Sequence, residues 1–164
     1  MSIMIENSAK KVAYIGIDPG KDGAMAALCY DVDLKHEVYL QGFDRVLLRR
    51  ALKSLKAAGF AICVVVEHVG GIPGQSAPAA FNFGENAGFI HGVLETLEIP
   101  YELVRPQKWK KEFSCTSDKN TSINVAKRLF PEIDLRKSPR CTKDHDGLAE
   151  ALLMAEYARR RNMA

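Results

Sequence analysis

Residues 12–28, VAYIGIDPGKDGAMAAL, place an acidic residue directly after a hydrophobic run. Residues 12–17 have the composition of a strand buried on both faces, and Asp18 follows them at once. Pro19 and Gly20 then predict a turn before a second apolar run. A carboxylate beside a sheet core costs free energy unless it is neutralised or hydrogen-bonded. Asp18 is therefore either a turn residue bonded to its own backbone or a metal ligand with partners elsewhere in the chain.

The bulk composition is that of an ordinary soluble protein. The chain has 164 residues, of which 47% are hydrophobic and 26% charged. We expect one domain at 11–164 after a flexible tail at 1–10. No apolar run approaches the roughly 20 residues of a membrane span, and no signal peptide is recognisable. Four separated cysteines indicate reduced thiols rather than a zinc site: Cys29, Cys63, Cys115 and Cys141. We therefore expect a cytoplasmic protein of a bacterium or phage-infected cell, with an organellar matrix or stroma as the alternative.

The predicted elements follow the order of three strands, a helix, a strand, a helix, a strand and further helices. Strands are predicted at 12–17, 23–30, 35–43, 60–69 and 101–106, and helices at 44–58, 79–97, 107–113, 118–130 and 144–161. Short turns join the first three strands, which favours an antiparallel meander. A helix before the apolar fourth strand favours parallel pairing with the first. This order predicts an α/β fold of the ribonuclease H-like class, a mixed five-stranded sheet flanked by helices.

The fourth strand repeats the pattern of the first, because Glu67 ends the run ICVVVE. If the two strands are parallel neighbours, Asp18 and Glu67 end at the same edge of the sheet, where sites of α/β proteins form. Asp146 and Glu150 lie four residues apart on one face of the last predicted helix. Taken alone, Asp146 could be a helix-dipole partner and Glu150 a surface residue. The four together are oxygen ligands that suit Mg2+, with Mn2+ as a substitute.

Such a carboxylate set is typical of phosphodiester chemistry. Two bound ions about 4 Å apart can activate water and stabilise a leaving oxygen. The charge distribution agrees, since residues 105–143 contain 11 Lys and Arg against 4 Asp and Glu. This basic half indicates a polyanionic partner such as nucleic acid, although a solvated lysine-rich surface would give the same count. The residues therefore indicate a metal-dependent nuclease.

Four segments together resemble the successive motifs of RuvC-type Holliday junction resolvases. They are IGIDPGKDGA, VVVEHV, RPQKWKKEF and DHDGLAEALLMAEYA, and the resemblance runs from about Val12 to Arg160. It is closest to the branch that includes phage resolvases and the plant chloroplast resolvase. The resemblance implies a homodimer that binds four-way junction DNA in recombination and repair and nicks two opposing strands symmetrically.

The resemblance also implies roles for individual residues. Asp18 would bind both metal ions, and Glu67, Asp146 and Glu150 would complete the ligand set. Lys119 would lie near the scissile phosphate, although a solvated surface lysine is the simpler alternative. Bacterial RuvC proteins space the last two ligands three residues apart, whereas here the spacing is four, so Asp144 and His145 stay open as alternatives to Asp146.

A second group of residues is predicted to bind nucleic acid. Phe81 and Phe83 follow the Gly- and Pro-rich loop 70–78 and could stack on unpaired bases, or else pack in the core. Trp109 is interpreted as the anchor of a basic turn that holds phosphate. The basic residues predicted to contact phosphate are Lys108, Lys110, Lys111, Lys119, Arg140 and Lys143.

The predicted helix 79–97 carries a glycine every fourth residue, at Gly84, Gly88 and Gly92. Each glycine costs about 0.5–1 kcal/mol against alanine in a helix, so three on one stripe favour a close helix contact. We expect this face to form the dimer interface, with packing against the chain's own sheet as the alternative.

Three other functions fit parts of the sequence. A RuvC-like nuclease for other branched DNA or structured RNA would use the same carboxylates. A phosphotransferase of the sugar-kinase and actin type has a similar first strand but needs two such domains, which 164 residues cannot hold. A catalytically silent nucleic-acid-binding module would not need four carboxylates.

Overall fold

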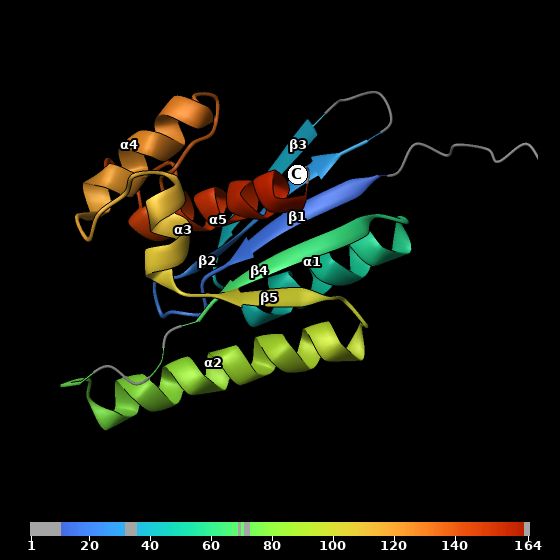
Figure 1. Cartoon of the computed structure of the whole chain (residues 1–164), viewed down its shortest axis with the longest axis horizontal. Coiled ribbons are helices and arrows are strands. Elements are labelled where there is room, and N and C mark those ends of the chain that lie inside the picture. The colour runs from blue at the N-terminus through green and yellow to red at the C-terminus, as the bar shows by residue number, and fades with distance from the viewer. Residues whose placement is uncertain (1–10, 32–35, 69, 71–72, 163–164) are drawn as a thin grey trace, which may run out of the picture.

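The five predicted strands form one mixed sheet in the computed structural model, which describes residues 11–31, 36–68, 70 and 73–162. The strand order is β3-β2-β1-β4-β5 (Figure 1). The bounds are β1 Val12–Ile17, β2 Ala24–Tyr30, β3 His36–Gly42, β4 Ala61–Glu67 and β5 Tyr101–Val104. β1, β2 and β3 pair antiparallel, and β4 and β5 add on in parallel. The predicted ribonuclease H-like sheet is confirmed.

The register of β1 and β4 sets the geometry of the acidic edge. Ile17 lies opposite Val66 in a parallel pair, so Asp18 and Glu67, the next residues on each strand, emerge at the same edge. At this edge Glu67 still pairs with Val104 of β5, which keeps its backbone in the sheet. The two carboxylates are thus neighbours because of strand pairing alone.

Helices cover both faces of the sheet. They are α1 Arg45–Ala57, α2 Ala77–Thr96, α3 Pro106–Glu112, α4 Lys119–Leu129 and α5 Asp146–Asn162. Alternate residues of β1 point to opposite layers: Tyr14 packs with α3, α4 and α5, and Ala13 and Ile15 pack with α1 and α2. Because every strand residue faces one of two cores, the central strands read as continuous apolar runs.

Gly16 lets α5 lie directly on β1. A Cβ at this position would be 2.4 Å from the carbonyl oxygen of Ala151 and 2.5 Å from the backbone nitrogen of Ala155. No side chain larger than hydrogen fits there, and the small residues of α5 meet the strand at the same place. This close approach places the first turns of α5, with Asp146 and Glu150, beside the acidic edge.

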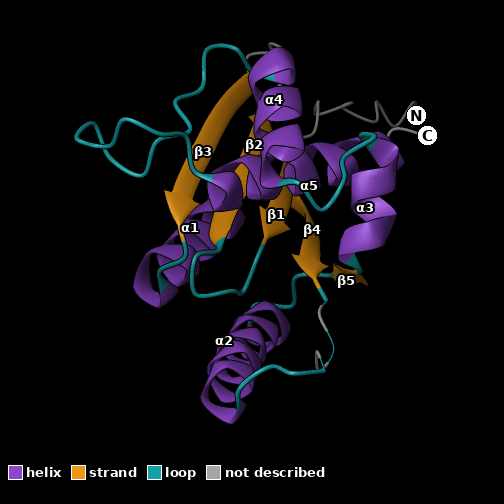
Figure 2. Ribbon diagram, turned by 90° about the vertical axis from the view of Figure 1, so that its left-hand side faces the viewer, coloured by secondary structure: helices purple, strands orange, loops and turns teal. Residues whose placement is uncertain are grey.

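α2 stands apart from the two layers at its N-terminal end (Figure 2). It is held through buried Ile90 and Leu94, whereas Phe81 is 70% exposed. Asn86 joins α2 to α1 and to the turn after β1. The Asn86 Oδ1 accepts a hydrogen bond from Arg45 Nη2 of α1 at 2.8 Å, and the Asn86 Nδ2 donates to the carbonyl oxygen of Pro19 at 3.2 Å.

The glycine stripe of α2 faces open space. Among the described residues nothing lies within 4 Å of a Cβ built at Gly84, Gly88 or Gly92. The alternative prediction, that this stripe packs against the chain's own sheet, is therefore wrong.

Two helices begin two residues away from the predicted start for local reasons. α2 begins at Ala77 instead of residue 79, because Ser76 caps the helix and Pro78 fits its first turn. α5 begins at Asp146 instead of 144, because Asp144 forms a β-bridge with Arg136 and the His145 backbone N–H donates to Leu135. The predicted tail 1–10 and part of the predicted loop, residues 71–72, lie outside the described residues. None of the described helices is long and apolar enough to cross a membrane.

Candidate functional site

Asp18 serves in the turn after β1 and also faces other carboxylates. Its Oδ1 accepts a hydrogen bond from the Gly20 backbone N–H at 2.9 Å, which is the turn role expected for an aspartate before Pro-Gly. Burial raises the pKa of Asp18, and the nearby charges of Glu150 and Asp146 raise it further. Asp18 is therefore both a turn residue and a member of an acidic cluster.

Glu67 is buried beside Asp18 and bonded to a tryptophan. Glu67 is only 8% exposed. The fully buried Trp109 donates a hydrogen bond from its Nε1 to Glu67 Oε1 at 3.0 Å. Burial and the charge of Asp18 raise the pKa of Glu67 to about 7, although the Trp109 hydrogen bond opposes the shift. A neutral indole N–H satisfies one oxygen without removing the negative charge.

Glu150 reaches the same cluster from α5. Its Oε1 is 2.8 Å from Lys110 Nζ and accepts from Ser122 Oγ at 3.3 Å. Lys110 follows Trp109 in α3, so two adjacent residues contact two different carboxylates of the site. The charge of Lys110 also acts to lower the pKa of both Asp18 and Glu67.

Asp146 lies at the outer side of the cluster, one helical turn before Glu150. Lys119, at the start of α4, is 71% exposed, and its Nζ contacts Asp146 Oδ2 at 2.7 Å. Burial acts to raise the pKa of Asp146, but the hydrogen bond and charge of Lys119 outweigh it and leave the pKa lowered. The same bond raises the pKa of Lys119. Lys119 therefore lies at the edge of the acidic cluster, with its side chain largely exposed to solvent.

The four carboxylates are the right donors for a hard divalent cation but are not drawn into a coordination shell. Among residues 11–31, 36–68, 70 and 73–162, no three His, Cys, Asp or Glu side chains are arranged to hold a metal ion together. Lys110 and Lys119 contact two of them instead. The donor set is all oxygen, with pKa values of Asp18 and Glu67 raised partly by like charges, as expected where a cation is needed. The chemical type of these side chains therefore fits a divalent cation.

The two alternatives to Asp146 are placed differently. Asp144 Oδ2 is 2.8 Å from Lys127 Nζ, on the outer side of α4. His145 Nδ1 is buried and has no hydrogen-bond partner within the described part of the chain. His145 therefore stays a prediction as the alternative to Asp146. Gly147 allows this close packing, because a Cβ there would be 2.1 Å from the carbonyl oxygen of Asp22.

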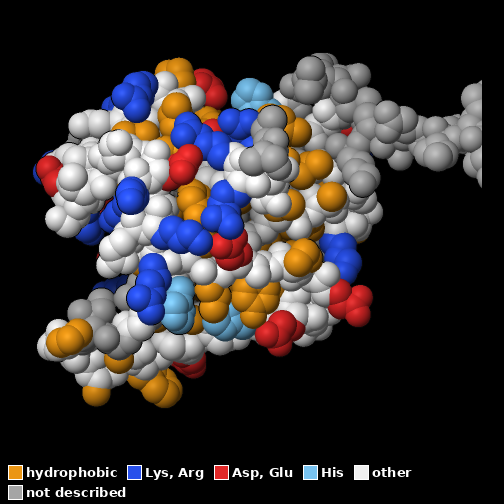
Figure 3. All heavy atoms as spheres, viewed as in Figure 1, with side chains coloured by type: hydrophobic (Ala, Val, Ile, Leu, Met, Phe, Trp, Pro, Cys, Tyr) orange, Lys and Arg blue, Asp and Glu red, His pale blue; other side chains and the backbone are white. Residues whose placement is uncertain are grey.

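The residues predicted to bind nucleic acid surround the site unevenly. Figure 3 shows Lys and Arg side chains gathered over α3 and the end of α5, mixed with acidic groups. Lys108 lies 3.6 Å from Glu102, which is also 3.5 Å from Arg161, so Lys108 faces away from the acidic cluster. The three remaining predicted phosphate contacts are exposed: Lys111, Arg140 and Lys143. Lys110, in contrast, is an internal partner of Glu150.

One of the two predicted stacking residues lines a cavity beside the turn that follows Asp18. Phe83 lines this space of about 740 Å3 together with Gly20, Lys21 and Arg45, while Phe81, two residues earlier in the chain, is 70% exposed. Neither phenylalanine belongs to the buried core. The cavity lies between the N-terminal half of α2 and the turn after β1.

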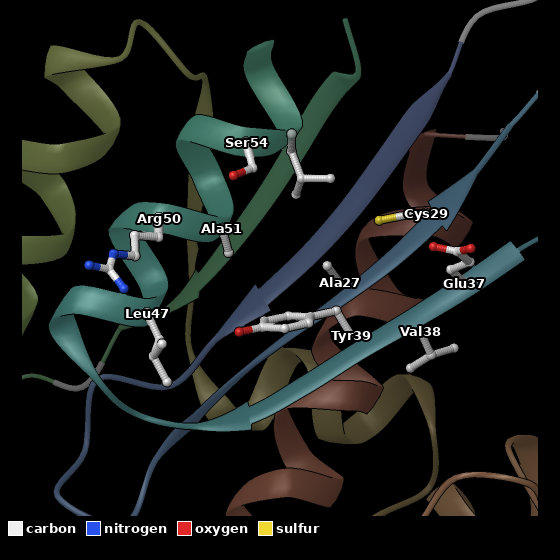
Figure 4. A pocket seen from close by; sticks show the side chains of 10 residues that line it. Ala27, Cys29, Glu37, Val38, Tyr39, Leu47, Arg50, Ala51 and Ser54 are labelled. Atoms are coloured by element: carbon white, nitrogen blue, oxygen red, sulfur yellow. The ribbon is translucent and has the colours of Figure 1, made fainter. Parts of the chain in front are cut away.

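A second hollow lies between α1 and β3 and is unrelated to the acidic cluster. Figure 4 shows Tyr39, Leu47, Arg50 and Cys29 around it, and its volume is about 430 Å3. Among the described residues that line it, Glu37 is the one carboxylate. Its walls are mainly apolar, so it does not resemble a site for phosphate or metal chemistry.

Sequence reasoning missed the functional contacts of α3. Trp109 is fully buried, as an anchoring side chain would be, but its indole N–H donates to Glu67, a contact that the sequence did not indicate. Lys110 and Ser122 were likewise not expected beside Glu150. An isolated tryptophan flanked by lysines gives no sequence signal for such contacts, since they depend on how α3 packs against β4 and α5.

The comparisons with known proteins agree with this architecture. No protein-family model matches the chain, and no curated protein matches it in sequence. Among solved structures, Thermus thermophilus RuvC in complex with a Holliday junction substrate is 20% identical, with a TM-score of 0.54, and the match covers 91% of this chain and 96% of that one. The chain has the fold of RuvC.

Two further structures support the same assignment. A second structure of Thermus thermophilus RuvC is 19% identical, with a TM-score of 0.54 and coverage of 92% of this chain and 97% of that chain. The yeast mitochondrial Holliday junction resolvase is 14% identical, with a TM-score of 0.52 and coverage of 86% and 75%. The RuvC fold thus spans nearly the whole chain.

Proposed function

We propose that this chain is a Holliday junction resolvase, a metal-dependent endonuclease that nicks opposing strands of four-way junction DNA. One observation carries the proposal. Asp18, Glu67 and Glu150 come from three distant segments and meet at one edge of a RuvC-fold sheet. The charge of Glu150 there raises the pKa of both Asp18 and Glu67. Buried like charges are unfavourable for stability and are retained at sites that bind a cation.

The proposed ligands of the divalent ions are Asp18, Glu67, Asp146 and Glu150, with Mg2+ or Mn2+ as the ion. When bound there, such ions supply activation of the attacking water and stabilisation of the leaving oxygen. The chain's own residues would orient the substrate around them. Asp18 would be held in place by its Gly20 bond, and Glu67 by its Trp109 bond.

Lys119 is proposed to contact the scissile phosphate. Its ammonium is mostly exposed yet 2.7 Å from Asp146, so a phosphate entering the site would meet a positive charge already beside the carboxylates. A fixed cation at that position would offset negative charge that develops on the phosphate oxygens. Exposed Lys111, Arg140 and Lys143 would bind the backbone further out, in a way that depends on salt but not on sequence.

A homodimer is part of the proposal. The glycine face of α2 is open, and Phe81 and Phe83 lie near the N-terminal end of the same helix. A second copy packed on this face would place two active sites around one two-fold axis, which matches a substrate with two equivalent strands. The aromatic side chains would then stack on unpaired bases at the centre of the junction.

The test is cleavage of a synthetic four-way junction beside linear duplex, a Y-fork and hairpin RNA, with Mg2+ and with EDTA. Asp18→Asn and Glu150→Gln are the active-site variants, and Glu132→Gln, an exposed acid between α4 and α5, is the matched control. We expect paired symmetric nicks on the junction that vanish in EDTA and in both variants but persist in the control. Preferential cleavage of forks or RNA would assign the same site to another branched substrate. Junction binding without cleavage would make the chain a catalytically silent binding module.

A further inference from the structure

Lys110 is placed where a cation of the acidic cluster is expected. Its Nζ is 2.8 Å from Glu150 Oε1, and the two side chains are 19% and 12% exposed. The neighbouring Trp109, fully buried, holds α3 in this position, with the ammonium 5.4 Å from its ring centroid. A lysine that is held between a carboxylate and an aromatic ring differs from a phosphate-binding lysine that extends into solvent.

The charge of Lys110 acts on the whole cluster. It stabilises the ionised forms of Asp18 and Glu67 as well as pairing directly with Glu150. Lys119 pairs with Asp146 at the outer side, so the inner three carboxylates share Lys110 as their cation. Without such a charge, three buried carboxylates would repel each other.

We propose that Lys110 is an internal counter-ion that holds Asp18, Glu67 and Glu150 together before a divalent cation binds, and that it competes with that cation for Glu150. The proposal rests on the divalent-cation site proposed above. Divalent binding would release the ammonium from Glu150. Lys110 is thus a positioning residue in the metal-free protein.

The alternative is a permanent ion pair. In that case Lys110 would help to place Glu150 for the metal, and its removal would weaken metal binding. The two roles predict opposite signs for the change in metal affinity, so the measurement separates them.

The test compares Lys110→Met, Lys110→Arg and Lys53→Met, the last an exposed lysine of α1. Thermal unfolding in EDTA and Mn2+ binding by electron paramagnetic resonance are measured without nucleic acid. We expect Lys110→Met to lower the Tm in EDTA and to bind Mn2+ about tenfold more tightly, because one competing unit charge is removed. Lys110→Arg should keep the high Tm and weak Mn2+ binding, and Lys53→Met should match the wild type.

The wild-type protein provides a readout that does not depend on a variant folding. The paired ammonium of Lys110 should give a protected side-chain signal in nitrogen NMR spectra in EDTA, and saturating Mg2+ should remove that protection. Unchanged or weaker Mn2+ binding by Lys110→Met, a Lys110 signal that persists in Mg2+, or a wild type that binds neither ion would overturn the proposal. Failure of the proposed function is distinguishable, since it would appear as absence of nucleic-acid cleavage while these binding measurements still gave their result.

Discussion

Trp109 Nε1 donates a hydrogen bond of 3.0 Å to Glu67 Oε1, and both residues are buried. The pair joins α3 to the end of β4 across 42 residues of chain. It keeps Glu67 oriented toward Asp18 although the two carboxylates repel. A buried hydrogen bond to a carboxylate of this kind sets the position of the side chain.

Trp109→Phe should therefore destabilise the protein and disturb Glu67. Phenylalanine fills most of the same space but offers no donor, so we expect a loss of about 1–3 kcal/mol in the free energy of unfolding. The pKa of Glu67 should rise above its value of about 7 because the hydrogen bond that lowers it is gone. Urea denaturation and carbon NMR titration of the Glu67 carboxyl measure the two effects. If Trp109→Phe is as costly in a Glu67→Leu background, the hydrogen bond is not the cause.

The stability of the metal-free protein should fall as pH rises through neutrality. Glu67 has its pKa raised from 4.5 to about 7, mainly by burial, so the folded protein binds this proton more tightly than the unfolded chain. The resulting stabilisation is complete below about pH 4.5 and is lost as pH rises through about 7. The raised pKa of Asp18 acts in the same direction. Tm measured in EDTA across this range checks the sign, and Glu67→Gln should flatten the slope.

Metal affinity should change with pH in the opposite direction. A divalent cation binds the ionised carboxylates, so the gain in Tm on adding Mg2+ should grow between about pH 5 and pH 7. The lowered pKa of Asp146 contributes stability above its ordinary value of 3.8 that is lost at lower pH, outside this range. A Mg2+ effect that is the same at both ends of the range would mean that Glu67 and Asp18 are not ligands.

Gly16→Ala should be strongly destabilising. The new methyl group would be 2.4 Å from a backbone oxygen of α5, and neither β1 nor the helix can move without opening the core. We expect a loss of about 3 kcal/mol or more in the free energy of unfolding. Gly42→Ala is the matched control in another strand, since nothing lies within 4 Å of its Cβ position among the described residues. Equal effects of the two substitutions would mean that α5 does not rest on Gly16.

Lys119→Met should lower the cleavage rate with little change in stability. Lys119 is 71% exposed, so removing it leaves no cavity, whereas loss of a cation beside the scissile phosphate should cost on the order of 10²-fold in rate. Single-turnover cleavage of the four-way junction measures the rate, and thermal unfolding measures the stability. Lys53→Met, an exposed lysine of α1, is the control. A wild-type rate for Lys119→Met would make Lys119 an ordinary surface lysine.

Gly88→Arg should produce a folded monomer. The position is open, so the arginine side chain fits within one chain but would separate two helices packed glycine face to glycine face. Sedimentation equilibrium should give a dimer for the wild type and a monomer for the variant, with symmetric paired cleavage lost. Asn124→Arg, an exposed site on α4, should stay dimeric. A dimeric Gly88→Arg protein would place the interface on another surface.

Local sequence patterns were enough to predict the sheet and the acidic residues at the ends of two of its strands. Continuous apolar runs at residues 12–17 and 61–66 are enough to predict buried parallel strands, and a carboxylate directly after such a run must lie at the edge. The four-residue spacing of Asp146 and Glu150 likewise placed both on one helix face. These are local patterns of period two or of one helical turn, and local patterns are what a single sequence displays.

Only the tertiary structure decided which groups surround those carboxylates. Trp109 and Lys110 are adjacent in a basic segment, yet one donates to Glu67 and the other pairs with Glu150, because α3 packs between β4 and α5. The glycine pattern of α2 likewise does not tell whether that face packs within the chain. The helix packs through Ile90 and Leu94, and the glycine face stays open. Contacts between segments far apart in the chain depend on how whole elements pack, and no spacing along the sequence encodes the direction in which one side chain meets another.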